Sequence, residues 1–247
     1  MKLKSIWLGL ALIPLSVTAL ASDASDSKVN PKVVAKAVEM GKHLRSLQKA
    51  EVTAKVTHDV TLESGHKIQA QGTSQMVFVD KNKLYMNIDS ENITREYFYD
   101  GKKLTQYSPN LQYYTTVDVA GNTLEMLNQV EKYYGLQLPL KALFQLGSDQ
   151  AELSKLTLAA YVGPSKINGQ VCDHLAFSQP GVDWQLWVSR AEKPLPCKLV
   201  ITKTDESSQP QTSQTFTWNL NPKVAASEFT FKPGKGDIAI PFKKIAE

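Results

Sequence analysis

The stretch from Tyr161 to Lys203 constrains the fold more than any other part of the chain. Runs rich in Val, Ile, Phe and Trp are separated here by the turn-forming dipeptides Asn168-Gly169 and Pro180-Gly181 and by a Pro194-Leu195-Pro196 corner. Asn-Gly favours a type I′ hairpin turn, because both central residues of that turn need positive φ angles. The stretch therefore predicts four antiparallel strands in series.

A two-residue turn at Pro180-Gly181 also sets the register of the strands that flank it. It places Phe177 opposite Trp184 on one face and His174 opposite Trp187 on the other. One face is then apolar and the other mixed. This asymmetry is typical of an antiparallel sheet that packs one side against a core or a ligand.

Residues 51–62 alternate with a period of two, which predicts a long strand. A Ser64-Gly65 turn joins it to a second strand over residues 68–78. This second strand carries small residues at its centre, Ala70, Gly72 and Ser74, so we expect open space above the sheet there. Further strands are predicted at 84–89, 94–99, 103–108, 113–117 and 211–220, and a last one near 229–231.

Two regions have the periodicity of helices. Residues 31–48 follow an N-cap at Asn30 and carry apolar side chains at spacings of three and four. A second region begins with a capping box of Asn122 and Glu125 and stops at Gly135, and a short apolar helix is expected from about 139 to 147. The pattern predicts an α+β fold, mainly antiparallel β, with helices lying across the sheet.

The first 21 residues have the layout of a secretory signal peptide. Two lysines precede an apolar run from Ile6 to Leu15 and an Ala19-Leu20-Ala21 cleavage motif. The run is shorter than the roughly 20 residues of a membrane-spanning helix. We therefore expect cleavage after Ala21 and a mature single domain over residues 22–247 that is periplasmic and not membrane-spanning. An uncleaved anchor is the alternative.

The charge balance argues against nucleic acid as a partner. The 28 basic residues include the two lysines of the leader, so the mature chain has 26 of them against 24 acidic residues. Its surface is nearly neutral, and no Lys or Arg cluster is dense enough to follow a phosphate backbone.

The sequence offers no motif for catalysis, metal binding or a cofactor. It contains no Gly-x-Ser-x-Gly elbow, no His-Glu-x-x-His helix and no phosphate-binding loop. His58 interrupts an apolar strand face, either as a buried functional group or, more simply, as a hydrogen-bonded core histidine. Arg95, one of three arginines, is a candidate for pairing with a lipid head group, with a solvated strand arginine as the alternative.

Cys172 and Cys197 are the only cysteines. In an oxidising compartment an even pair suggests a disulfide. In a regular meander both flank Ser189 from opposite sides, which separates their Cα atoms by ~9.5 Å, whereas a disulfide tolerates less than about 7 Å. A bond would need a bulge or a twisted corner at Pro196, so the sequence leaves the bonded and free states open.

Several short strings along the chain carry a family resemblance: Tyr99-Asp100-Gly101-Lys102, Leu138-Pro139-Leu140, Tyr161-Val162-Gly163-Pro164, Cys172-Asp173-His174-Leu175-Ala176-Phe177, Asp183-Trp184-Gln185-Leu186-Trp187, Pro194-Leu195-Pro196 and Leu199-Val200-Ile201-Thr202. The chain resembles a family of predicted periplasmic proteins of unknown function, similar in fold to the LolA/LolB lipoprotein carriers. The resemblance implies a curved, unclosed half-barrel sheet of about 11 strands with helices covering its concave face. It brings no catalytic residues, and Cys197 stands where the family is expected to have a basic or apolar residue, so no family disulfide carries over.

The leading functional hypothesis is a non-catalytic binding or carrier protein for a hydrophobic ligand, such as a lipid, an acyl chain or an acylated protein. The expected lid is the helical insert at 123–146, and Arg95 is the head-group candidate. The expected cavity and lid residues are Val56, His58, Val60, Ala70, Gly72, Met76, Leu127, Leu140, Leu143 and Phe144. The alternative is a structural or partner-binding envelope module in which the helices fill the sheet and no cavity remains. A hydrolase is the third possibility.

Overall fold

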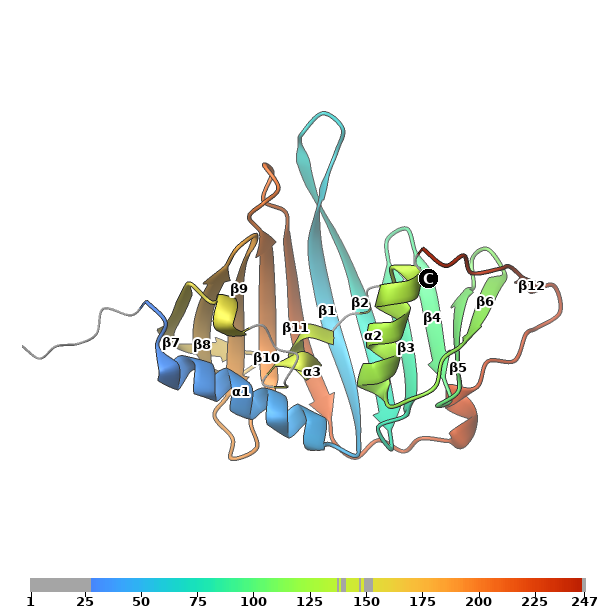
Figure 1. The fold of residues 1–247 in the computed structure, drawn as a ribbon, viewed down its shortest axis with the longest axis horizontal. Helices are drawn as coiled ribbons and strands as arrows, with labels where there is room; N and C mark the ends of the chain where they lie inside the picture. Colours follow the sequence, from blue (N-terminus) through green and yellow to red (C-terminus); the bar gives the residue numbers. More distant parts are fainter. Residues whose placement is uncertain (1–27, 137, 139–140, 147, 149–152, 246–247) are drawn as a thin grey trace, which may run out of the picture.

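The computed structural model describes residues 28–245 except 137, 139–140, 147 and 149–152 (Figure 1). The predicted signal peptide and its cleavage site lie outside the described residues, and the division into a leader and a single domain stays a prediction. The described residues form twelve strands: β1 (Lys49–Thr61), β2 (Lys67–Val79), β3 (Lys83–Ser90), β4 (Thr94–Tyr99), β5 (Lys103–Ser108), β6 (Tyr113–Asp118), β7 (Leu158–Ile167), β8 (Gln170–Gln179), β9 (Val182–Ser189), β10 (Pro196–Lys203), β11 (Gln211–Asn219) and β12 (Ile238–Ala239).

All twelve strands belong to one open sheet, in the order β12-β6-β5-β4-β3-β2-β1-β11-β10-β9-β8-β7. Every pairing is antiparallel except the parallel one between β12 and β6. The expected class, an unclosed and mainly antiparallel sheet with few helices, is confirmed. The sheet has one more strand than the approximate number implied by the resemblance, and the two-residue β12 was not foreseen.

Three α-helices lie on the same face of this sheet, which we call the inner face (Figure 1). The opposite face is the outer face. The helices are α1 (Pro31–Ser46), α2 (Thr123–Tyr134) and α3 (Lys141–Gln145), and two short 3-10 turns are η1 (Leu153–Lys155) and η2 (Ala226–Phe229).

The predicted caps place the helix ends. The Asn30 side chain accepts a hydrogen bond of 3.0 Å from the Lys32 backbone N–H, and α1 ends at Ser46 because Leu47 is extended, with φ −63° and ψ 130°. In α2 both halves of the capping box form, and Gly135 takes the left-handed conformation, with φ 67°, that stops the helix.

The main core lies between the inner face and the helices. Alternate residues of nearly every strand point inward and are buried together with the α1 stripe Val33, Ala37, Met40 and Leu44. The approach of α1 to the segment after α3 is close: a Cβ atom on Gly41 would lie 2.2 Å from the Leu146 carbonyl oxygen. On this half of the inner face the α1 stripe is part of the buried core.

The four strands predicted from 161 to 203 are confirmed as β7 to β10. Phe177 pairs with Trp184 and His174 with Trp187, and both ring pairs stack, at centroid separations of 3.8 and 3.9 Å. The turn chemistry of this ribbon was therefore enough to fix its register.

Cys172 and Cys197 form a disulfide on the outer face. The pairing of β9 with β10 shifts register between Pro196 and Lys198, which is the irregularity that a bond required. It brings the two Cα atoms to 6.8 Å, within the range that a disulfide spans.

Two expectations about burial and strands are wrong. The apolar alternation of β1 continues beyond the covered part of the sheet, so Val52 is buried but Val60 is 37% exposed, on a hairpin that rises above the other strands (Figure 1). Residues 229–231 form no strand; η2 ends at Phe229, and the Phe231 ring packs among outer-face rings of β4, β5 and β6 at centroid separations from 4.9 to 5.4 Å. Phe229 and Phe231 alternate with a polar residue as in a strand, which led to the wrong prediction.

Candidate functional site

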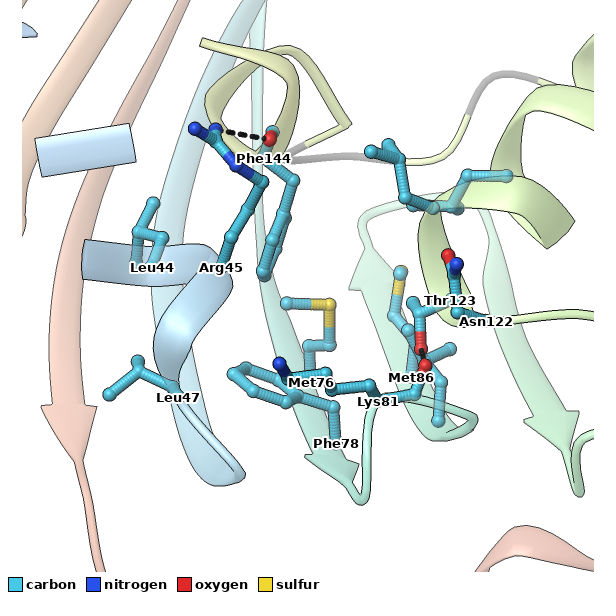
Figure 2. Close-up of a pocket in the computed structure, with 13 residues that line it drawn as sticks. Leu44, Arg45, Leu47, Met76, Phe78, Lys81, Met86, Asn122, Thr123 and Phe144 are labelled. Atoms are coloured by element: carbon cyan, nitrogen blue, oxygen red, sulfur yellow. Dashed lines mark hydrogen bonds between the residues drawn. The ribbon is translucent and has the colours of Figure 1, made fainter. Parts of the chain in front are cut away.

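A pocket of about 220 Å³ lies between the inner face and the ends of the three helices (Figure 2). Its floor comes from β2 and β3, and its sides come from the last turn of α1, the first turns of α2, and α3. Its lining is mostly apolar and consists of Leu44, Arg45, Leu47, Met76, Phe78, Lys81, Leu84, Met86, Asn122, Thr123, Leu124, Leu127 and Phe144.

The floor follows from strand alternation. Met76 pairs with Met86 and Phe78 with Leu84 across β2 and β3, so all four side chains point to the inner face. The Phe144 ring of α3 meets the Phe78 ring edge-on, with centroids 5.6 Å apart and planes at 84°. Methionine side chains adapt to irregular shapes because they are unbranched and polarizable, so this floor suits a ligand of variable shape.

Hydrogen bonds from the turn between β2 and β3 hold the start of α2 over the floor. Thr123 donates its backbone N–H and its hydroxyl to the Lys81 carbonyl, at 2.6 and 3.0 Å. Tyr99 donates its hydroxyl to the Gly121 carbonyl at 2.7 Å. Burial, with the nearby charges of Asp100 and Glu125, raises the pKa of Tyr99 to about 12, so the phenol remains a donor even in moderately alkaline solution.

Arg45 ties α3 to α1 at the side of the pocket. Its guanidinium donates to the carbonyls of Phe144, at 3.0 Å, and Leu146, and burial lowers its pKa from the ordinary value. Lys81 also lines the pocket, and its ammonium has no ion-pair partner in the part of the chain that the structure describes. Two positive groups therefore border an apolar space.

The structure brings together three of the predicted ligand-binding residues. Met76, Leu127 and Phe144 line the pocket, whereas Leu143 is buried in the core and is not among the lining residues. Leu140 lies outside the described residues. The binding role of these residues stays a prediction.

The other predicted residues lie along the β1–β2 hairpin, away from the pocket. Val56 and His58 are half-buried, Ala70 pairs with His58, and Val60 is exposed. The open space expected at Gly72 is absent, because a Cβ atom there would lie 2.5 Å from the Asp89 carbonyl oxygen of β3. The small residue accommodates a neighbouring strand and not a ligand.

Arg95 is exposed on β4 and does not line the pocket. Its charge acts on Tyr97, whose pKa is raised by burial and lowered in part by the guanidinium. Its role toward a lipid head group stays a prediction.

Sequence reasoning missed the polar lining residues Arg45, Lys81, Asn122 and Thr123. Asn122 was recognised only as a helix cap. Arg45 ends a helix and Lys81 sits in a turn, and neither position has a local pattern that indicates a pocket. Asn122 and Thr123 meet Lys81 because the start of α2 is bonded to the β2–β3 turn, and the last turn of α1 brings Arg45 to the same pocket.

The described part of the chain contains no group of three or more His, Cys, Asp or Glu side chains placed to hold a metal ion. None of its helices is long and apolar enough to cross a membrane.

Solved structures of low sequence identity align with most of the chain. An uncharacterised conserved protein of Thermus thermophilus has 9% identity, covers 85% of this chain and 98% of its own, and gives a TM-score of 0.46. The lipoprotein LppX of Mycobacterium tuberculosis has 12% identity, with coverage of 79% and 100% and a TM-score of 0.47. A LolA superfamily protein of Nitrosomonas europaea has 10% identity, with coverage of 82% and 98% and a TM-score of 0.38.

No curated protein matches the sequence significantly. The family described as "Predicted periplasmic protein (DUF2092)" matches residues 36–243. This range includes every strand of the sheet, the helices α2 and α3, and all of α1 after its first five residues. This match agrees with the resemblance and with the periplasmic location that the N-terminal sequence predicted. The chain belongs to this family of predicted periplasmic proteins.

Proposed function

We propose that the protein is a non-catalytic binding or carrier protein for an amphiphile that has an acyl chain and an anionic head. The observation that carries the proposal is the unfilled, largely apolar pocket between the inner face and the helices. Its position agrees with the hypothesis that the sheet and its helices hold a ligand between them.

The size of the pocket supports partial burial of a chain. Its volume of about 220 Å³ exceeds the ~150 Å³ of an engineered cavity that binds benzene and falls below the ~300 Å³ of the smaller drug-sized sites. Burial of about six methylene groups would contribute about 5 kcal/mol at ~0.8 kcal/mol each. This is enough to offset part of the cost of association.

The charged lining supports an anionic head. Arg45 and Lys81 border the pocket, and none of the described residues that line it is an Asp or a Glu. A carboxylate or phosphate near its mouth would gain charge-assisted hydrogen bonds from these side chains. A neutral hydrocarbon would gain none.

The alternative, a partner-binding module without a ligand, also rests on an observation. Beneath α1 the helix packs on the core of the inner face, and Ala37 and Met40 have no exposed surface. If the side chains around the pocket also pack together in solution, the helices serve only to cover the sheet.

Leu124→Trp distinguishes the two functions. Leu124 lines the pocket from the first turn of α2 and is only half-buried, so an indole there should occupy the pocket without overpacking the core. We expect uptake of a fluorescent fatty acid to weaken at least tenfold, with a melting temperature close to that of the wild type.

The matched control is Val162→Trp, which adds the same indole at an exposed position on β7 and should leave uptake unchanged. Absence of uptake by the wild-type protein, or equal uptake by Leu124→Trp, would contradict the proposal. Binding of a stoichiometric envelope protein by the ligand-free chain would then favour the partner-binding module.

A further inference from the structure

A row of exposed apolar side chains lies at the β12 edge of the sheet. Ile238 and Ile240 are 54% and 43% exposed, and Tyr113 is 41% exposed. Ile238 is the Cα partner of Tyr113 in the parallel pair of β12 with β6. We call these three residues the β12 surface.

The backbone places the three side chains on one side. Partners in a parallel pair project to the same face, and residues two apart on an extended segment do so as well. Ile238 and Ile240 continue the ladder by donating their N–H groups to the carbonyls of Gln112 and Tyr114, both at 2.8 Å. The row is therefore held in place by main-chain hydrogen bonds.

Lysines lie on the segment that carries this row and on the helix that the segment reaches. After β12 the chain crosses to the C-terminal end of α2 (Figure 1), where the Ile245 N–H donates to the Tyr133 carbonyl at 2.8 Å. The ammonium groups of Lys132 and Lys244 lie 4.8 and 5.8 Å from the centre of the Tyr133 ring. An aromatic ring with two cations near it thus lies where the segment that carries the apolar row meets α2.

The described acidic groups near this region do not neutralise it. Residues 232–245 contain four lysines and one acidic residue, Asp237. Asp237 already accepts hydrogen bonds from the Tyr107 hydroxyl, at 2.9 Å, and from the Gly234 N–H, at 2.6 Å. The nearby Glu131 of α2 is paired with Lys141. The segment keeps a net positive charge in an otherwise nearly neutral protein.

The geometry argues against a β-strand as the occupant. β12 has only two residues, and Pro241 follows soon after it, so the edge offers little for another strand to pair with. An apolar row beside lysines instead complements an anionic lipid surface, where apolar side chains enter the head-group boundary and ammonium groups contact phosphates.

We propose that the β12 surface docks on the surface of an anionic phospholipid membrane. Lys132 and Lys244 supply the electrostatic part of the attraction, and Tyr113, Ile238 and Ile240 supply the apolar part. Docking sets the C-terminal end of α2 beside the lipid, and the first turns of the same helix line the pocket. The membrane contact does not depend on whether the pocket holds a ligand.

Vesicle flotation of the full mature chain tests the proposal. Vesicles of phosphatidylethanolamine with phosphatidylglycerol should bind the wild type, and vesicles of phosphatidylcholine alone should bind it far less. Lys132→Gln with Lys244→Gln should weaken binding by about 25-fold, at about fivefold for each lysine, and added salt should weaken binding of the wild type. Ile238→Asn with Ile240→Asn should weaken it at least tenfold.

The β1–β2 hairpin provides a matched control. Val60 and Ile68 are Cα partners, 37% and 50% exposed, and the adjacent Lys67 is paired with Asp59. Val60→Asn with Ile68→Asn removes two exposed aliphatic side chains and should leave vesicle binding unchanged. Loss of binding in this variant with retention in the β12 variants would overturn the proposal.

Two other outcomes also contradict it: no binding to anionic vesicles, and equal binding to both vesicle types. A third is that the wild type is a dimer that does not bind vesicles and that Ile238→Asn with Ile240→Asn converts to a monomer. Leu124→Trp should float with the vesicles as the wild type does. Failure of pocket binding and failure of membrane docking are thus measured separately.

Discussion

Phe144→Ala distinguishes a pocket wall from ordinary core. Truncation of a fully buried phenylalanine costs about 3–5 kcal/mol, but Phe144 is half-buried and borders the pocket. Its edge-on contact with Phe78 contributes about 0.5–1.5 kcal/mol beyond burial. Its bond to Arg45 uses the main-chain carbonyl and survives the change. We expect a loss of about 1–2 kcal/mol in the free energy of unfolding.

Urea denaturation and titration with a hydrophobic probe measure the two effects on one purified variant. Loss of about 1 kcal/mol of contact with the probe should raise its dissociation constant about fivefold. Phe216→Ala is the control, because Phe216 is buried and does not line the pocket; it should lose about 3–5 kcal/mol without a change in probe affinity. A Phe144→Ala variant that is as unstable as this control, with probe binding intact, would refute the reasoning.

Gly41→Ala should lower the stability measured by urea denaturation, because the new Cβ would lie 2.2 Å from the Leu146 carbonyl oxygen, although alanine favours helices over glycine by about 1 kcal/mol. A more stable variant would show that the Leu146 segment moves away without cost. Burial alone would raise the pKa of Asp173, but hydrogen bonds from Lys36, Arg190 and Tyr161 hold it below the ordinary value. Its stabilisation is therefore complete above pH ~4 and lost as pH falls through the folded pKa. Asp173→Asn should cost about 1–3 kcal/mol at neutral pH and flatten the acid limb of the stability profile; an unchanged limb would contradict this. Replacing both cysteines with serine opens a loop with a sequence separation of 25 and should cost about 3.5 kcal/mol; an unchanged urea midpoint would show that the bond adds little.

Local chemistry explains what the sequence predicted well. The Pro180-Gly181 turn fixes the pairing of Phe177 with Trp184, and the Asn122 capping box fixes the start of α2. Each signal lies within a few residues of the structure that it determines. The strands and caps were therefore accessible without knowledge of the tertiary fold.

The candidate site was only partly accessible because it depends on which segments meet. Val52 and Val60 belong to the same alternating pattern, but only Val52 lies where helices cover the sheet. The small residue Gly72 suggested space for a ligand, but the backbone of β3 occupies that space. Arg45 and Lys81 come from distant parts of the sequence to the same pocket, a meeting that no local pattern encodes.

Native mass spectrometry of the protein purified from its own periplasm tests the central claim most directly. We predict that the wild type carries one acyl-chain ligand for each chain, that solvent extraction releases it, and that Leu124→Trp purified in parallel carries much less. Masses of the ligand-free chain alone, together with no uptake of an added fatty acid, would contradict the account.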